Sequence, residues 1–155
     1  MKERHIKKGQ LLVNKGDVSN KVFLVQEGLL RSYSIDDKGK EHIFMFAPKG
    51  WVIADYNHFD APSQLFIDAI EDSVVVQVDK QSAIEHDVPK LIRRIQVLQN
   101  RVIMLMSATA IERYEHFVET YPDIVQRVPQ KMIASYLGIT PEALSTVKRQ
   151  RLRKK

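Results

Sequence analysis

Glycines at near-regular intervals constrain this sequence more than any other feature. Five of the six glycines lie in the first 50 residues, at Gly9, Gly16, Gly28, Gly39 and Gly50. Glycine adopts turn conformations that other residues resist, and turn signals recurring roughly every 8–12 residues between β-rich runs are typical of an antiparallel roll or sandwich. We therefore expect an antiparallel β-body in the first half of the chain.

The runs between these glycines alternate in polarity or are rich in β-forming residues. The polar residues 36–40 have the composition of a hairpin tip. The predicted strands occupy residues 10–13, 21–26, 29–35, 41–46, 65–69 and 73–78.

From residue 79 onward the pattern becomes helical, with a short helix predicted at 81–85 and Pro89 suited to the first turn of a longer one. Apolar residues then recur in steps of four and three, which is the spacing of a heptad seam. The predicted dimer seam consists of Leu91, Ile95, Leu98, Val102 and Leu105. The alternative is a single amphipathic helix packed on the β-body. Apolar residues off the seam favour the dimer, because a helix that is apolar on more than one face needs two partners.

The net charge of +5 is concentrated at the end of the chain. Residues 127–155 contain eight Lys or Arg against one Glu, whereas the other 126 residues carry 16 basic and 18 acidic side chains. A basic segment of this kind suggests an acidic partner such as nucleic acid.

Residues 130–137 and 141 to about 151 are predicted to form two helices. Gly138 ends the first helix, Thr140 can cap the second, and Pro141 fits its first position. Two helices joined by a short glycine turn have the layout of a helix-turn-helix. The alternative is an ordinary helical hairpin followed by a disordered basic tail.

Residues 128–145 (Val-Pro-Gln-Lys-Met-Ile-Ala-Ser-Tyr-Leu-Gly-Ile-Thr-Pro-Glu-Ala-Leu-Ser) are very similar to the DNA-binding helix-turn-helix of Crp/Fnr transcriptional regulators. Residues 8–12, 15–17, 23–28, 37–41 and 48–50 resemble the cyclic-nucleotide-binding β-roll of that family. The resemblance implies an α+β fold with an antiparallel jelly roll at 1–80, a helical dimerisation segment at 81–121 and a helix-turn-helix at 122–155. It also implies a homodimer that binds double-stranded DNA, with RNA polymerase and a small-molecule effector as further partners. Because nothing in the sequence marks the chain for secretion, we expect a cytoplasmic location. No enzymatic activity is expected.

The family resemblance also assigns residues to the DNA. The candidates for base contacts are Pro141, Glu142, Ser145 and Thr146. The candidates for backbone contacts are Gln130, Lys131, Thr140, Lys148, Arg149 and Arg151. Glu142 can accept from cytosine N4, and Ser145 or Thr146 can contact bases or a thymine methyl group.

The effector pocket departs from the pattern of the family, which pairs Gly-Glu with a phosphate-binding arginine. Ala54 and Asp55 stand at the first pair, and Ser63 replaces the arginine. Losing such a charge-assisted contact costs about 1.5–3 kcal/mol. We therefore expect cAMP to bind weakly or not at all, no cofactor, and a pocket that holds another effector or none. Its predicted lining is Ala54, Asp55, Ser63, Gln64, Leu98 and Gln99.

The start and the end of the chain also differ from the family. We expect a short form without the helical segment before the roll and without the wing after the second helix of the helix-turn-helix. The basic residues 151–155 are expected to take over the phosphate contacts of the wing.

One alternative is a metal-dependent enzyme built on the same kind of roll. His58 and Asp60 form a His-x-Asp pair of the type found in two-His-one-carboxylate sites. The third ligand would be His42, His86 or His116, and none has the spacing that such sites favour. The sequence contains no cysteine, which excludes disulfides, thiolate ligands and a thiol nucleophile. It also lacks a membrane-length apolar run and a secretion signal, so no membrane partner is expected.

Overall fold

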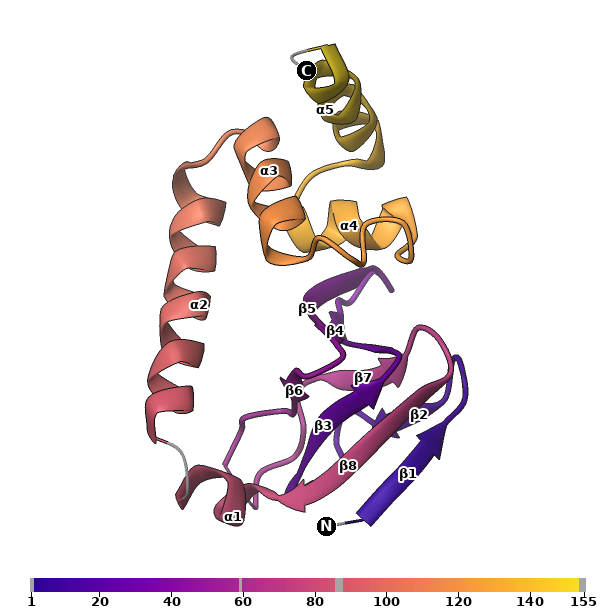
Figure 1. Cartoon of the computed structure of the whole chain (residues 1–155), viewed down its shortest axis with the longest axis vertical. Helices are drawn as coiled ribbons and strands as arrows, with labels where there is room; N and C mark the ends of the chain where they lie inside the picture. The colour runs from indigo at the N-terminus through magenta and orange to yellow at the C-terminus, as the bar shows by residue number, and fades with distance from the viewer. Residues whose placement is uncertain (1, 59, 86–87, 154–155) are drawn as a thin grey trace. The chain divides into compact units, whose positions relative to one another are not determined.

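The structure is a computed structural model that describes residues 2–58, 60–85 and 88–153. The chain divides into two compact units, Met1–Val88 and Pro89–Lys155 (Figure 1). None of the described helices combines the length and apolarity needed to cross a bilayer.

The first unit is a roll of two four-stranded antiparallel sheets, followed by one short helix. One sheet has the order β1-β8-β3-β6 and the other β2-β7-β4-β5. The elements are β1 (Lys2–Ile6), β2 (Leu11–Val13), β3 (Lys21–Glu27), β4 (Leu29–Ile35), β5 (Glu41–Pro48), β6 (Val52–Ile53), β7 (Phe66–Ala69), β8 (Ser73–Asp79) and α1 (Lys80–Glu85). The six predicted strands are present to within two residues at each end. The sequence did not predict β1 and β6, which are polar or only two residues long.

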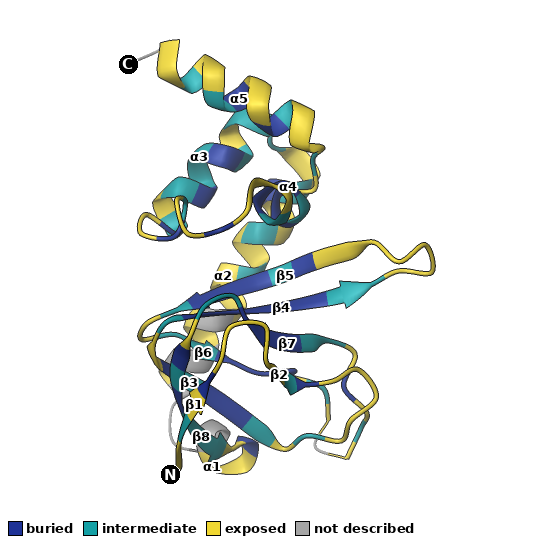
Figure 2. Cartoon of the chain, turned by 90° about the vertical axis from the view of Figure 1, so that its right-hand side faces the viewer, coloured by how far each residue is buried: buried dark blue, intermediate teal, exposed yellow. Residues whose placement is uncertain are grey.

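The core of the roll is formed by apolar residues that point inward from both sheets. Its members are Ile6, Val13, Phe23, Val25, Leu30, Met45, Ala47, Ile53, Ile67, Ala69 and Val75. Figure 2 shows burial continuing along β4, whereas the hairpin tip between β4 and β5 is exposed. At that tip the Asp36 carboxylate accepts hydrogen bonds from the amides of Lys38 and Lys40, at 2.9 and 3.0 Å.

An ion cluster centred on the buried Arg31 joins β4 to both of its neighbours. The Arg31 guanidinium donates to both carboxylate oxygens of Asp68 on β7, at 2.7 and 2.9 Å, and to Glu41 on β5, at 2.7 Å. Burial alone would lower the pKa of Arg31, but the hydrogen bonds to the two carboxylates outweigh it and raise that pKa. The charge is therefore paired, as a buried ion requires.

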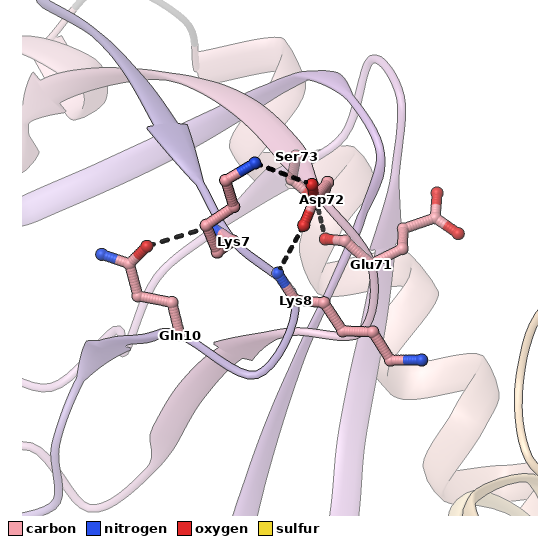
Figure 3. A network of polar contacts seen from close by, with 6 residues as sticks. All are labelled: Lys7, Lys8, Gln10, Glu71, Asp72 and Ser73. Atoms are coloured by element: carbon pink, nitrogen blue, oxygen red, sulfur yellow. Dashed lines mark hydrogen bonds and ion pairs between the residues drawn. The ribbon is translucent and has the colours of Figure 1, made fainter.

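Two loops at one end of the roll are held together by the Asp72 carboxylate (Figure 3). This carboxylate accepts a hydrogen bond from the Lys8 amide at 2.8 Å and forms an ion pair with the Lys7 ammonium at 3.0 Å. Gly28 lies beside the same hairpin with φ +89°, and a Cβ added there would come within 2.6 Å of the Asp72 carbonyl oxygen. Only glycine fits at that position, because both the conformation and the space exclude a side chain.

The described residues of the second unit form four helices. They are α2 (Val88–Ser107), α3 (Ala110–Thr120), α4 (Gln130–Leu137) and α5 (Pro141–Arg153). A capping box begins α3, in which the Glu112 amide donates to the Thr109 hydroxyl and the Thr109 amide donates to the Glu112 carboxylate at 2.7 Å. This cap separates α2 from α3 within the segment that the sequence predicted only as helical. Residues of the predicted dimerisation segment and of the predicted helix-turn-helix therefore share one compact unit.

Candidate nucleic-acid interface and effector loop

The turn between α4 and α5 is built from local signals that the sequence carries. Gly138 is left-handed (φ 65°, ψ 33°), and the Ile139 amide donates back to the Ala134 carbonyl at 3.1 Å. This is the hydrogen bond of a Schellman cap. The Thr140 hydroxyl then accepts a hydrogen bond from the Ala143 amide at 3.2 Å. Thr140 therefore caps α5, whose first residue is Pro141. Both helix boundaries match the prediction.

The angle between α4 and α5 is held by buried side chains. Ala134 and Leu137 of α4 are buried, as are Leu144 and Val147 of α5. Phe117 of α3 lies next to Tyr136 of α4, with ring centroids 5.5 Å apart. The three helices α3, α4 and α5 therefore share one core.

The predicted base-contacting residues lie on the outer face of α5. Glu142, Ser145 and Thr146 are all exposed, and their spacing of three and four places them on the same helix face. Arg149, a predicted backbone contact, is also exposed and continues this face seven residues after Glu142. The Ser145 and Thr146 hydroxyls donate to the carbonyls of residues 141 and 142, at 3.0 and 3.1 Å. Each hydroxyl oxygen still has acceptor capacity. Pro141, also exposed, stands at the N-terminal end of this face.

The predicted backbone-contacting residues are spread over both helices. The Lys148 ammonium donates to the Gln130 side chain at 2.9 Å, which brings the start of α4 and the middle of α5 together. Lys131 is exposed beside them. Arg151 lies apart, with its guanidinium 5.8 Å from the ring centroid of Tyr114 on α3. Thr140 serves as a helix cap.

Two arginines that sequence reasoning did not single out hold this unit together. Arg101 of α2 stacks 4.0 Å from the ring centroid of Tyr136 and donates to the Tyr136 carbonyl at 3.3 Å. Burial lowers the pKa of Arg101. Arg113 of α3 donates to the main-chain carbonyls of Ala108, Leu137 and Leu105. No sequence motif marks either residue, because their partners lie at the ends of other helices.

The predicted seam on α2 divides between two faces. Ile95 and Val102 are 56% and 55% exposed, whereas Leu98 and Leu105 are half-buried. Leu105 faces the α4–α5 turn, where its Cδ2 would be 3.6 Å from a Cβ on Gly138. The side chain of Leu91 lies outside the described residues. The exposed apolar stripe of α2 therefore consists of Ile92, Ile95, Val102, Ile103 and Met106.

The effector loop, residues 54–58 and 60–65 of the roll, brings together four of the predicted pocket residues. Ala54, Asp55 and Ser63 are buried and Gln64 is exposed. The Asp55 carboxylate accepts from the Ser63 hydroxyl and from the amides of Asn57, Gln64 and Leu65. Burial raises the pKa of Asp55, but these hydrogen bonds together outweigh it and lower that pKa. The other two predicted pocket residues, Leu98 and Gln99, lie on α2 in the second unit.

The metal-site alternative gains no support from the structure. No group of three His, Asp or Glu side chains that could hold a metal ion occurs among the described residues. His42 is bound instead to Asp36 across the β4–β5 hairpin, at 2.8 Å. His86 lies outside the described residues, and His116 is on α3 in the second unit.

Comparison with known proteins identifies relatives of both units. The cyclic nucleotide-binding domain family matches residues 3–85. The fumarate and nitrate reduction regulatory protein of Yersinia pestis is 28% identical over 169 aligned positions, which cover 93% of this chain and 66% of that protein. The anaerobic regulatory protein of Haemophilus influenzae is 25% identical, and the alignment covers 93% of this chain and 64% of that protein. The chain therefore spans just under two thirds of the length of these relatives.

Solved structures have the same fold. FixK2 from Bradyrhizobium japonicum superimposes with a TM-score of 0.79 at 22% identity, covering 99% of this chain and 85% of that one. A Crp/Fnr-family transcriptional regulator from Thermus thermophilus gives a TM-score of 0.76 at 15% identity, covering 99% and 87%. The predicted α+β fold and the resemblance to Crp/Fnr regulators are both confirmed. This chain belongs to the cyclic nucleotide-binding domain family and has the fold of the Crp/Fnr regulators.

Proposed function

We propose that this protein is a sequence-specific DNA-binding regulator of transcription that acts as a homodimer. The observation that carries the proposal is the exposed polar face of α5, presented by a helix-turn-helix whose two helices share a buried core. The homology to anaerobic regulatory proteins supports the same function. No catalytic role is proposed.

The second helix of a helix-turn-helix enters the major groove with its N-terminal residues against the base edges. In α5 those residues are Pro141, Glu142, Ser145 and Thr146. The carboxylate of Glu142 is suited to accept from cytosine N4, and the two hydroxyls can accept or donate. Proline brings no donor, so a guanine contact at that position is not part of the proposal.

The phosphate contacts are assigned to the cations and polar groups around this face. Lys131, Lys148 and Arg149 can form ion pairs with phosphates, and Arg151 extends the basic surface along α5. The Gln130–Lys148 hydrogen bond holds one of these cations at the junction of the two helices. Thr140 is assigned both a cap and a phosphate contact.

The dimer is assigned to α2. Its exposed stripe includes Ile92, Ile95, Val102 and Met106. These residues are separated by three, seven and four positions, which matches the heptad spacing of two paired helices. A stripe of this kind is costly to leave in water, and pairing with a second copy buries it. Two helix-turn-helix units then meet two half-sites of a two-fold-related DNA site.

The regulatory ligand is proposed not to be cAMP or cGMP. Ser63 stands where a phosphate-binding arginine is expected, and the Asp55 carboxylate is engaged by the loop itself. Titration calorimetry with either nucleotide tests this point, and micromolar binding would contradict it. RNA polymerase as a partner and a cytoplasmic location follow from a role in transcription and belong to the same proposal.

The decisive test of DNA recognition is selection of bound sequences from a random duplex pool at physiological salt. We expect a palindromic or pseudo-palindromic consensus. A variant with Glu142→Ala, Ser145→Ala and Thr146→Ala serves as the matched control, because it keeps the cations and removes the proposed base contacts. Recovery of no consensus from the wild-type protein would refute sequence-specific recognition.

A further inference from the structure

Gln99 lies in the middle of the exposed apolar stripe of α2, which is one continuous helix over Val88–Ser107 (Figure 1). Gln99 is itself exposed, and it stands four residues after Ile95 and three before Val102. Residues three and four apart on a helix share one face. With Gln99 included, the stripe has the alternating steps of four and three that the core of a helix pair requires. The core positions are then Ile92, Ile95, Gln99, Val102 and Met106.

The other side of α2 packs within its own unit. Met104 is buried, and Leu98 and Leu105 are half-buried. Arg101 stacks on an aromatic ring of α4. These residues lie on a different face of the helix from Gln99, so the face that carries Gln99 is the one that the unit leaves exposed.

The chemistry of Gln99 fits a second copy of the same helix. A carboxamide carries an acceptor oxygen and two N–H donors, so two glutamines can hydrogen-bond to each other. In a two-fold symmetric interface, a residue next to the axis meets its own copy. An apolar partner at this position would bury the amide without a hydrogen bond, and that costs free energy.

Ion pairs cannot fix the register of two paired α2 helices. In coiled coils, charged residues that flank the core commonly choose the partner and the register. The sequence of α2 contains no Asp or Glu. Its flanking positions are also uncharged, namely Gln96, Leu98, Ile103 and Leu105. Gln99 is therefore the residue of the stripe that can distinguish one register from another.

We propose that Gln99 fixes the register of the dimer and restricts pairing to chains with a hydrogen-bonding residue at the same position. Its carboxamide meets that of the second copy beside the two-fold axis. A seam shifted along the helix, or one that is apolar at this position, leaves the amide unpaired. This role differs from the effector-pocket role that the sequence predicted for Gln99. It rests on the dimer of the proposed function.

Subunit mixing tests the choice of partner. Gln99→Leu makes the stripe apolar throughout, and it replaces an exposed residue of the protomer, so the variant should fold. Its homodimer should have a dissociation constant about tenfold lower than wild type, because pairing no longer buries a polar group. Tagged wild-type and untagged Gln99→Leu chains are then mixed far above both dissociation constants. The mixed dimer should form less often than random pairing predicts, since it sets an amide against an apolar side chain.

Disulfide mapping tests the register, and the absence of cysteine from the sequence makes it clean. In a parallel pair in register, Val102→Cys lies opposite its own copy and should cross-link to it under mild oxidation. A pair shifted by one heptad would instead join Ile95→Cys of one chain to Val102→Cys of the other. We expect only the first cross-link while Gln99 is present. Adding Gln99→Leu should lower its yield and allow the second.

Asn100→Leu is the matched control, because it adds the same apolar side chain on another face of α2. It should leave both the mixing and the cross-links as in wild type. Random pairing of wild-type with Gln99→Leu chains, or identical cross-links with and without Gln99→Leu, would overturn the role of Gln99 and leave the dimer intact. A wild-type protein that stays monomeric would refute the dimer itself and this role with it.

Discussion

The guanidinium of Arg113 on α3 lies 3.0 Å from the carbonyl oxygen of Leu137, the last residue of α4. The same guanidinium donates to the carbonyls of Leu105 and Ala108, at 2.8 and 3.0 Å, where α2 ends. The last carbonyls of a helix have no partner within it and carry a partial negative charge. One cation therefore caps two helices, and it ties the end of α2 to the turn that orients α5.

Replacing Arg113 should weaken DNA binding although the residue does not lie on the proposed interface. Arg113→Met removes three charge-assisted hydrogen bonds and should cost about 2–3 kcal/mol of folding free energy. Arg113→Lys keeps the charge but loses the planar fork, so it should restore only part of that stability. Denaturant unfolding and DNA affinity, measured on the same samples, check both expectations.

The outcome for DNA separates a positioning role from simple destabilisation. At a temperature where Arg113→Met is still folded, we expect its affinity for the selected site to fall about tenfold, or about 1.4 kcal/mol. Glu119→Gln on the exposed side of α3 is the control and should bind like wild type. Wild-type affinity in a folded Arg113→Met protein would show that the cap does not orient α5.

The salt dependence of DNA affinity distinguishes the phosphate contacts proposed for α5 from its proposed base contacts. Each phosphate contact contributes about 0.9 to the slope of log affinity against log salt concentration. Arg149→Gln should therefore reduce the magnitude of that slope by about 1.8 in a homodimer, with little change in the preferred sequence. Glu142→Gln should do the opposite, changing the preferred base while leaving the slope nearly the same. An unchanged slope in Arg149→Gln would remove this residue from the phosphate contacts.

The exposed stripe of α2 predicts which substitutions should dissociate the proposed dimer. Ile95→Glu together with Val102→Glu places two like charges opposite their copies in a paired helix, so the protein should become monomeric at micromolar concentration. Asn100→Glu adds a charge on another face of the same helix and is the matched control. Analytical ultracentrifugation of the three proteins measures the change. A dimer that survives the double substitution would locate the interface elsewhere.

The stability of the roll should depend on pH through Asp55. Hydrogen bonds hold the pKa of Asp55 below its ordinary value in the folded protein. The stabilisation from the carboxylate is therefore complete above the unfolded pKa of about 4 and is lost as the pH falls through the lower folded pKa. Asp55→Asn should be less stable than wild type at pH 7, and its stability should fall less steeply below about pH 4.

Thermal unfolding of both proteins between pH 7 and pH 2 provides the measurement for Asp55. Asp60→Asn, at an exposed position in the same segment, controls for the change in net charge. Parallel curves for wild type and Asp55→Asn would mean that this carboxylate does not contribute to the pH dependence.

Local signals allowed much of this fold to be predicted. The boundaries of α4 and α5 follow from Pro129, Gly138, Thr140 and Pro141, because caps and turns are decided by a few neighbouring residues. The strands between the early glycines were also predictable, because glycine turns mark where each strand begins and ends. The short strand β6 was not, since two residues carry too little periodic pattern to distinguish a strand from a loop.

The sequence by itself therefore determined the roll, the helix-turn-helix and the basic character of its end. Which side of α2 stays exposed was decided only by the tertiary structure, in which Met104 is buried and Leu105 faces the α4–α5 turn. The cap made by Arg113 and the filling of the loop by Asp55 were also decided there. Both depend on side chains that meet backbone groups distant in the chain, and such contacts leave no periodic or local pattern in the sequence.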